Sequence, residues 1–273
     1  ASYDTQIMWL AYKEARTLLK IELSPVELLE EARADEVKTL GADHPTTVAT
    51  TLKLVDAYVA GGRTRETAPL LASASSANPS DTILALKVAA MQAWFGQEKE
   101  FAATRKRLLA FAKGSTDSAT CEHVAKACSI RPSTDDADLE AALALGRTAV
   151  KVNKNWVWNQ LSLGMAEYRS GNDAASIEAM LAAEKADPNI PVVMGISGFY
   201  RAMSLFRQGK HDEARKLALE TAAQMKPLPK DEQNPLADGA SYDTQIMWLA
   251  YKEAKAMIQF DEAAPPKAEN DKK

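Results

Sequence analysis

The sequence has little of what most other protein classes depend on. Aromatic residues make up 7% of its 273 positions, and it contains only 12 glycines, 12 prolines and two cysteines. That is too little aromatic and turn-forming content for a β-sandwich or β-barrel, and two cysteines do not build a disulfide-stapled fold. No apolar run approaches the roughly 18 residues of a membrane span, and the first residues lack the basic start and apolar core of a signal peptide. We therefore expect a cytoplasmic protein without membrane contact.

What the sequence does contain favours helices. Hydrophobic residues make up 46% and charged residues 26%, which is typical of a folded rather than a disordered chain. Alanine occupies 49 positions, and alanine-rich, glycine-poor chains favour closely packed helices. The net charge of −4 argues against non-specific nucleic-acid binding. The composition therefore predicts an all-α protein that binds no nucleic acid.

One segment occurs twice without change. Residues 1–15, Ala-Ser-Tyr-Asp-Thr-Gln-Ile-Met-Trp-Leu-Ala-Tyr-Lys-Glu-Ala, recur as residues 240–254. Natural helical repeats keep a hydrophobic pattern and vary the other positions, so identity over fifteen residues at opposite ends indicates copying. We interpret the chain as engineered by duplication of its C-terminal helix at the N-terminus. A very recent natural duplication is the alternative.

Apolar residues at helical spacing, separated by glycine and proline turns, predict six helix hairpins. The predicted pairs are 3–19 with 26–40, 48–60 with 66–75, 82–95 with 101–113, 119–129 with 137–152, 156–169 with 174–186, and 192–207 with 212–225. We expect them to stack as one right-handed α-solenoid over residues 1–226. A Pro-rich connector, 227–239, is expected to be extended and too polar for the core; the copied helix, 240–260, and a disordered tail, 261–273, follow.

The hairpins resemble tetratricopeptide repeats, which have a period of 34 residues. The fifth hairpin fits best, because it places small or turn-forming residues where that repeat has them: Gly164, Gly171, Ser176, Ala183 and Pro188. The small residues would let paired helices approach closely. The resemblance implies a solenoid that binds proteins or peptides rather than an enzyme.

A narrower resemblance concerns kinase-associated repeats. The stretch Asp43-His-Pro-Thr-Thr before a helix is similar to kinesin-light-chain-like repeats of bacteria. The stretches Cys128-Ser-Ile-Arg-Pro132 and Trp248-Leu-Ala-Tyr-Lys-Glu-Ala254 resemble the C-terminal repeat region of planctomycete serine/threonine protein kinases, over about residues 26–260. This implies a scaffold beyond a kinase domain. The chain itself has no Gly-rich phosphate loop, His-Arg-Asp or Asp-Phe-Gly.

No motif predicts catalysis, a metal site or a cofactor. The three histidines fall in different predicted hairpins, and Cys121 and Cys128 lack a metal-ligand spacing with them. We expect both cysteines to be buried structural thiols. The stretch Gly195-Ile-Ser-Gly198 is not a nucleophile elbow, which needs one residue on each side of the serine.

The first helices of the hairpins usually line the binding groove of such a solenoid. Here the groove positions are apolar, which argues against capture of acidic C-terminal peptides and suits an apolar helix, such as the copied one. The candidate groove residues are Trp158, Leu161, Met165, Phe199, Tyr200 and Met203.

The duplication predicts self-association. We expect the C-terminal copy to cover the last hairpin with one apolar stripe and to leave another stripe open, and the N-terminal copy to pair with 26–40. Such complementary ends join head to tail into a ring or a filament. The predicted interface residues are Ile7, Met8, Leu10, Ala11 and Tyr12, and Ile246, Met247, Trp248, Leu249 and Tyr251. The alternative is a protein- or peptide-binding module in which the extra helix is only a cap.

Overall fold

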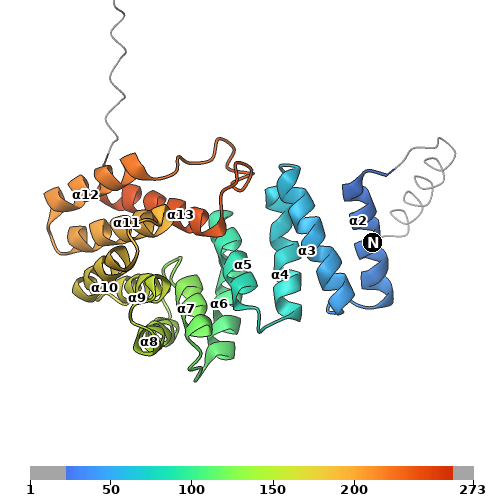
Figure 1. Ribbon diagram of the computed structural model, residues 1–273, viewed down its shortest axis with the longest axis horizontal. Coiled ribbons are helices and arrows are strands. Elements are labelled where there is room, and N and C mark those ends of the chain that lie inside the picture. Colours follow the sequence, from blue (N-terminus) through green and yellow to red (C-terminus); the bar gives the residue numbers. More distant parts are fainter. Residues whose placement is uncertain (1–22, 261–273) are drawn as a thin grey trace, which may run out of the picture.

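The computed structural model describes residues 23–260, which form twelve α-helices and no strand (Figure 1). The helices are α2 Pro25–Thr39, α3 Pro45–Ala60, α4 Thr64–Ala77, α5 Thr82–Trp94, α6 Glu98–Ala112, α7 Ser118–Cys128, α8 Asp136–Val152, α9 Val157–Arg169, α10 Asp173–Ala186, α11 Pro191–Arg207, α12 His211–Gln224 and α13 Tyr242–Ile258. The all-α prediction is confirmed for this range. The predicted helix 3–19 and the tail 261–273 lie outside the described residues.

The helices pair and stack as a solenoid. Each hairpin joins neighbours in the chain: α3 with α4, α5 with α6, α7 with α8, α9 with α10, and α11 with α12. From α4 onward, each second helix also contacts the first helix of the next hairpin. The first helices α5, α7, α9 and α11 contact one another in that order, so they form one continuous layer. The predicted α-solenoid is confirmed, with α13 added to it.

Local sequence explains where the helices begin and end. Gly171 and Gly209 turn their hairpins with φ angles of 81° and 80°, in the left-handed region that a side chain disfavours. At the other kind of turn, the Asp135 carboxylate accepts hydrogen bonds from the amides of Ala137 and Asp138 at the start of α8. These residues stop one helix and start the next at the positions that the sequence predicts.

Small residues bring α9 and α10 together. The Ser176 hydroxyl donates to the Gly164 carbonyl at 2.8 Å, and both residues lie where the two helices meet. A Cβ atom at Gly164 would lie 2.8–2.9 Å from the Met180 side chain, closer than real contacts. The fifth hairpin therefore needs glycine at this position.

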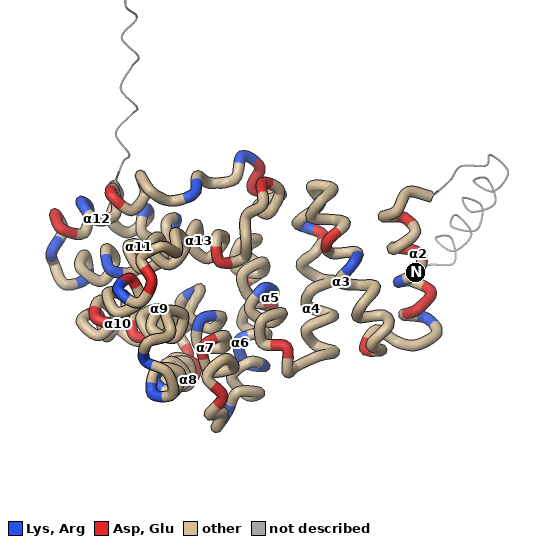
Figure 2. Tube along the Cα trace, in the orientation of Figure 1, with Lys and Arg blue, Asp and Glu red and all other residues tan. Residues whose placement is uncertain are grey.

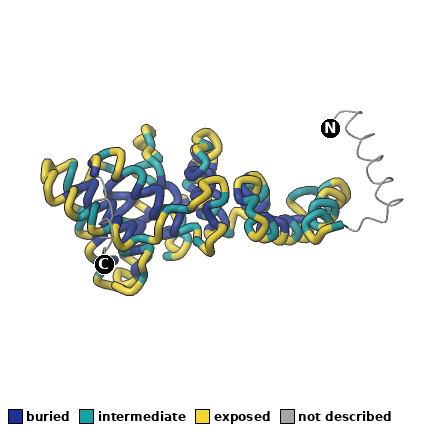
Figure 3. Tube along the Cα trace, turned by 90° about the horizontal axis from the view of Figure 1, so that it is seen from above, coloured by how far each residue is buried: buried dark blue, intermediate teal, exposed yellow. Residues whose placement is uncertain are grey.

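The layer of first helices is interrupted between α3 and α5. In the part of the chain that the structure describes, the α3 and α5 backbones do not come close, and α4 is the only helix of the α2–α4 arm whose backbone contacts the helices that follow. Seen from above (Figure 3), buried residues crowd the α5–α13 body and thin out toward α2. No residue of α2 is buried. A small apolar cluster between α3, α4 and α5 holds the arm in place.

The connector after α12 packs against this junction. The Asn234 side chain accepts a hydrogen bond from the Thr64 amide at 3.0 Å, and the Trp94 indole donates to the Glu232 carbonyl at 2.9 Å. Leu236 is 5% exposed and belongs to the α3–α5 cluster. The expectation that the connector is too polar for the core is therefore wrong at Leu236. A polar connector can place a single apolar side chain in the core, because the polar groups around that side chain form hydrogen bonds.

Replacing Gly164 by leucine should destabilise the fold, because the added side chain overpacks the α9–α10 contact. We expect a loss of about 1–3 kcal/mol, which is roughly 2–10 °C in melting temperature for a chain of this size. Thermal unfolding followed by circular dichroism measures it. Ala174→Leu, at an exposed position of α10, is the matched control. Equal melting temperatures for both variants would show that the predicted register is wrong.

Candidate helix-binding inner face

Helix α13 lies across the layer of first helices, which we call the inner face (α5, α7, α9 and α11). It packs against α11, α12 and α5 (Figure 1). Within residues 23–260, α5 and α11 make no contact with each other, yet both contact α13. The inner face must therefore curve around α13, so this helix of the same chain packs inside the curve of the solenoid.

The apolar residues of α13 are covered on every side. The six consecutive residues from Ile246 to Tyr251 are each at most 5% exposed. Residues in a row point in all directions around a helix, so no stripe of α13 stays open along this stretch. The expectation that the C-terminal copy leaves a stripe for a following helix is wrong. The copy enters the curve of the inner face instead of capping the end of the stack.

The candidate groove residues prove to be core residues. Five of the six are at most 1% exposed: Leu161, Met165, Phe199, Tyr200 and Met203. Phe199 meets Tyr251 of α13 edge to face, with ring centroids 5.5 Å apart. Trp158 is half-buried and lies under the Lys126 ammonium at 4.4 Å. These residues therefore offer no open surface in the described chain, with Phe199 covered by α13, and the peptide groove stays a prediction.

A buried guanidinium ties α13 to α9. Arg169 ends α9, and its side chain is only 4% exposed. It donates to both carboxylate oxygens of Glu253, at 2.5 and 2.7 Å, in the bidentate geometry that arginine favours. It also donates to the Ser129 and Ile130 carbonyls and to the Tyr200 hydroxyl. Burial would lower the pKa of Arg169, but Tyr200 and Glu253 outweigh it and raise the pKa, so the group stays charged.

A buried ammonium provides a second charged contact, with α7. The Lys126 side chain is 4% exposed and lies 3.0 Å from Glu122 and 3.3 Å from Asp243 at the start of α13. Burial would lower the pKa of Lys126, but Glu122 and Asp243 raise it above its usual value. Asp243 and Glu253 stand ten residues apart, about 15 Å along the helix. The two contacts together fix the direction and the register of α13.

A glycine lets α13 come close to α11. A Cβ atom at Gly195 would collide with the Met247 sulfur, so any side chain there would push α13 away. In the same way, a Cβ atom at Gly198 would collide with the Thr221 side chain of α12. Ser197 between them is fully buried, and its hydroxyl is directed at the Met180 carbonyl at 3.4 Å. The Gly195–Gly198 stretch is thus a packing device.

Two tryptophans join α13 to the connector. Trp248 packs against Trp94 of α5 with ring centroids 5.7 Å apart, and its indole donates to the Lys226 carbonyl at 2.8 Å. Lys252 pairs with Glu232 at 2.7 Å. The connector and α13 therefore dock as one unit, with both indole donors satisfied.

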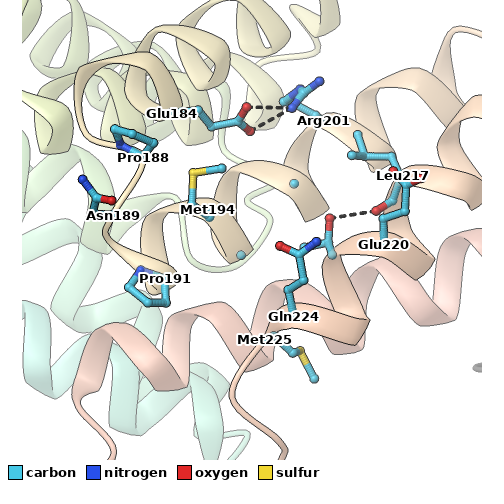
Figure 4. Close-up of a pocket in the computed structure, with 13 residues that line it drawn as sticks. Glu184, Pro188, Asn189, Pro191, Met194, Arg201, Leu217, Glu220, Gln224 and Met225 are labelled. Carbon is cyan, nitrogen blue, oxygen red and sulfur yellow. Dashed lines mark hydrogen bonds and ion pairs between the residues drawn. The ribbon is translucent and has the colours of Figure 1, made fainter.

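The described residues also include a cavity, two thiols and several side chains of metal-ligating type. A cavity of about 390 Å³ lies between α10, α11 and α12, and its charged lining includes Glu184 and Arg201, paired at 2.8 Å (Figure 4). Cys121 and Cys128 are buried free thiols, as expected, and burial raises the pKa of Cys128 to about 12. Between residues 23 and 260 no group of three metal-ligating side chains comes together.

Charged residues of both signs are mixed along the described chain. Figure 2 shows Lys and Arg interspersed with Asp and Glu over the whole described chain, without a stripe of one sign. Of the helices in residues 23–260, none has the length and apolar character needed to cross a membrane.

Sequence reasoning missed the residues that hold α13. Lys126, Arg169 and Gly195 were not singled out for binding, because a lone basic residue in a helix usually faces solvent. The available signal was the pair of carboxylates, Asp243 and Glu253, at a fixed spacing within the copied segment.

Comparisons with known proteins find only distant similarity to solved structures. The sequence matches no known protein-family profile and no curated protein. Among solved structures, a tetratricopeptide-repeat protein of Thermus thermophilus is 19% identical, covering 77% of this chain and 99% of that one, with a TM-score of 0.46. One from Parabacteroides merdae is 16% identical, covering 85% and 93%, with a TM-score of 0.47. Yeast Tom70 is 13% identical, covering 89% and 46%, with a TM-score of 0.40. At these values, none assigns a ligand or an activity to this chain.

Replacing Glu253 by glutamine should destabilise the protein, because it leaves the Arg169 guanidinium buried without a countercharge. Breaking a fully buried pair costs about 3–5 kcal/mol. Since the Glu253 side chain is 21% exposed, we expect about 2–3 kcal/mol in urea unfolding after that discount. Glu232→Gln, in the exposed pair with Lys252, is the control and should cost less than about 1 kcal/mol. Equal effects would mean that Arg169 is satisfied without α13.

Proposed function

We propose that the chain is a non-catalytic helical-repeat scaffold whose inner face binds one specific helix and which associates head to tail with further copies of itself. One observation carries the proposal. The helix that fills the inner face is encoded by residues 240–258, and its first fifteen residues are repeated without change at 1–15. A surface that binds this segment from its own C-terminus can bind the same segment from another chain.

The N-terminal copy has every side chain by which α13 is held up to Ala254. Its Asp4, Met8 and Glu14 correspond to Asp243, Met247 and Glu253, which contact Lys126, Gly195 and Arg169. The apolar residues correspond as well: Ile7, Trp9, Leu10, Ala11 and Tyr12 to Ile246, Trp248, Leu249, Ala250 and Tyr251. The first copy of one chain would thus take the place of α13 in the next, which gives a ring or a filament.

At low protein concentration, the covalent link through the connector favours binding of the chain's own α13 over the N-terminal copy of another chain. The connector, 227–239, holds α13 beside its site, and a short linker raises the effective concentration to the mM range. Its docking at Thr64 and Trp94 limits its freedom further. Exchange between chains therefore requires that α13 and the connector release together. We expect closed monomers in dilute solution and assemblies as the concentration rises.

The same geometry supports a scaffold without catalysis, cofactor or metal. The thiols and the Ser197 hydroxyl are buried and serve packing. The charged side chains of the inner face are paired with one another rather than aimed into a cavity. Two free cysteines suit the reducing cytoplasm, where we place the protein.

A second function is favoured by the burial of α13 from Thr244 to Tyr251. A helix that is covered on all sides and held by two buried charges can be a permanent part of the fold. The chain would then be a protein- or peptide-binding module, such as the repeat region of a bacterial serine/threonine kinase. Its N-terminal copy would act only as a cap on α2.

The self-association proposal and the binding module with an N-terminal cap can be distinguished by light scattering coupled to size-exclusion chromatography. The measurement is made over a range of protein concentrations. Self-association predicts a mass that rises with concentration. Trp9→Arg should abolish the rise, because an arginine at the place of Trp248 cannot enter the core beside Trp94, while α13 stays native. Deleting residues 1–15 should have the same effect.

Lys13→Gln is the matched control, because the corresponding Lys252 makes an exposed pair. It should associate like the unaltered chain. A strict monomer at every concentration, with or without Trp9→Arg, supports the cap and sinks the self-association proposal.

A further inference from the structure

The two copies of the helix differ only in how they end. After the shared fifteen residues, the C-terminal copy continues Lys255-Ala-Met-Ile-Gln-Phe260, and the N-terminal copy continues Arg16-Thr-Leu-Leu-Lys-Ile21. Contacts made by the shared residues cannot distinguish the copies. Any intrinsic preference of the inner face for one copy must come from these last six positions.

The six positions differ in how far their side chains are buried. In the C-terminal copy, Lys255, Ala256 and Gln259 are exposed, Met257 is half-buried, and Ile258 and Phe260 are buried. At position 258 the exchange is isoleucine for leucine, which have the same volume. The candidates for discrimination are therefore Met257, replaced by Leu18, and Phe260, replaced by Ile21.

Phe260 is held where its ring completes a row of aromatic side chains. Gln259 ends α13 in the left-handed conformation, with φ 53°, and this turns the chain back onto the helix. The Phe260 ring, 1% exposed, then lies edge to face with Tyr251 at a centroid distance of 6.0 Å. Tyr251 in turn meets Phe199 of α11 at 5.5 Å. The left-handed conformation is unfavourable for a residue with a side chain, so burial of the Phe260 ring must hold it.

Met257 contributes less. Its sulfur lies 3.9 Å from the Tyr168 hydroxyl, at the limit of a weak hydrogen bond. Exchange of methionine for leucine conserves volume and is usually tolerated. The preference between the copies must therefore rest mainly on the ring at position 260.

We infer that Phe260 is the residue that makes the inner face prefer the chain's own helix over the N-terminal copy of another chain. This inference rests on the proposed function, since it names what regulates exchange at that site. An isoleucine at this place forms no edge-to-face pair with Tyr251 and fills less of the space. Aromatic pairs add a factor of about 2 to 12 beyond simple burial, and the unfilled space adds to it. The own helix is thus favoured about tenfold by sequence, in addition to its tether.

The full-length variant Phe260→Ile/Met257→Leu tests this, because it gives the C-terminal copy the buried residues of the N-terminal one. Hydrogen exchange of the α13 amides should become about tenfold faster, while the amides of α9 keep their rates. The concentration at which the mass begins to rise should fall by a similar factor. Gln259→Lys, which introduces another residue of the N-terminal copy at an exposed position, should change neither by more than about twofold.

The reciprocal variant Ile21→Phe guards against a folding defect, because it leaves α13 untouched. It should strengthen association about tenfold. The inference is overturned if the double variant leaves the hydrogen-exchange rates of the α13 amides unchanged. It is also overturned if the Ile21→Phe chain associates no more strongly than the unaltered chain associates. If hydrogen exchange of the α13 amides becomes faster but every variant stays monomeric, Phe260 still holds α13 on the inner face. In that case only the self-association proposal fails.

Discussion

The buried guanidinium of Arg169 is the interaction on which the rest of the structure depends. It ends α9, reaches the last carbonyls beyond α7, touches Tyr200 of α11 and pairs with Glu253 of α13. Four helices therefore meet at one charge that is almost fully buried. A charge in this position is tolerable only if every partner is present, so the curvature of the inner face and the presence of α13 are linked.

The second constraint is how closely the helices can approach. Gly164 of α9 and Gly195 of α11 remove side chains where Met180 and Met247 enter, so neighbouring helices can come close to these two first helices. The layer can curve, because adjacent first helices contact one another, whereas among the second helices of the described chain only α6 and α8 do. The resulting curve is just large enough for one helix with a wide apolar surface. The small residues and the buried charges thus act together, the first admitting α13 and the second orienting it.

Helices and hairpins could be predicted because their signals are local: apolar spacing, glycine turns and capping carboxylates lie within a few residues of each other. The place of α13 could not. Its apolar residues predict burial on several sides without naming the neighbours, and Glu253 lies 84 residues from Arg169. The burial of Leu236 was missed because a single apolar residue in a polar connector shows no periodic spacing of apolar residues. Lys126 and Arg169 look like ordinary surface charges until the fold brings carboxylates to them.

A chain with two copies of one helix cannot place both in the same environment, since the inner face holds only one. The other copy must find a different site in its own chain or the same site in another. Within the described residues, the α2 end provides no buried cation for Asp4 and Glu14: Lys38 and Lys53 are exposed, and Arg33 is half-buried and donates to Thr51. Charged groups are stabilised by partners in a protected setting far more than by water-exposed ones. The inner face of a second chain would offer the copied helix the two cations that its carboxylates fit, and this charge pattern is the physical basis of the proposed association between chains.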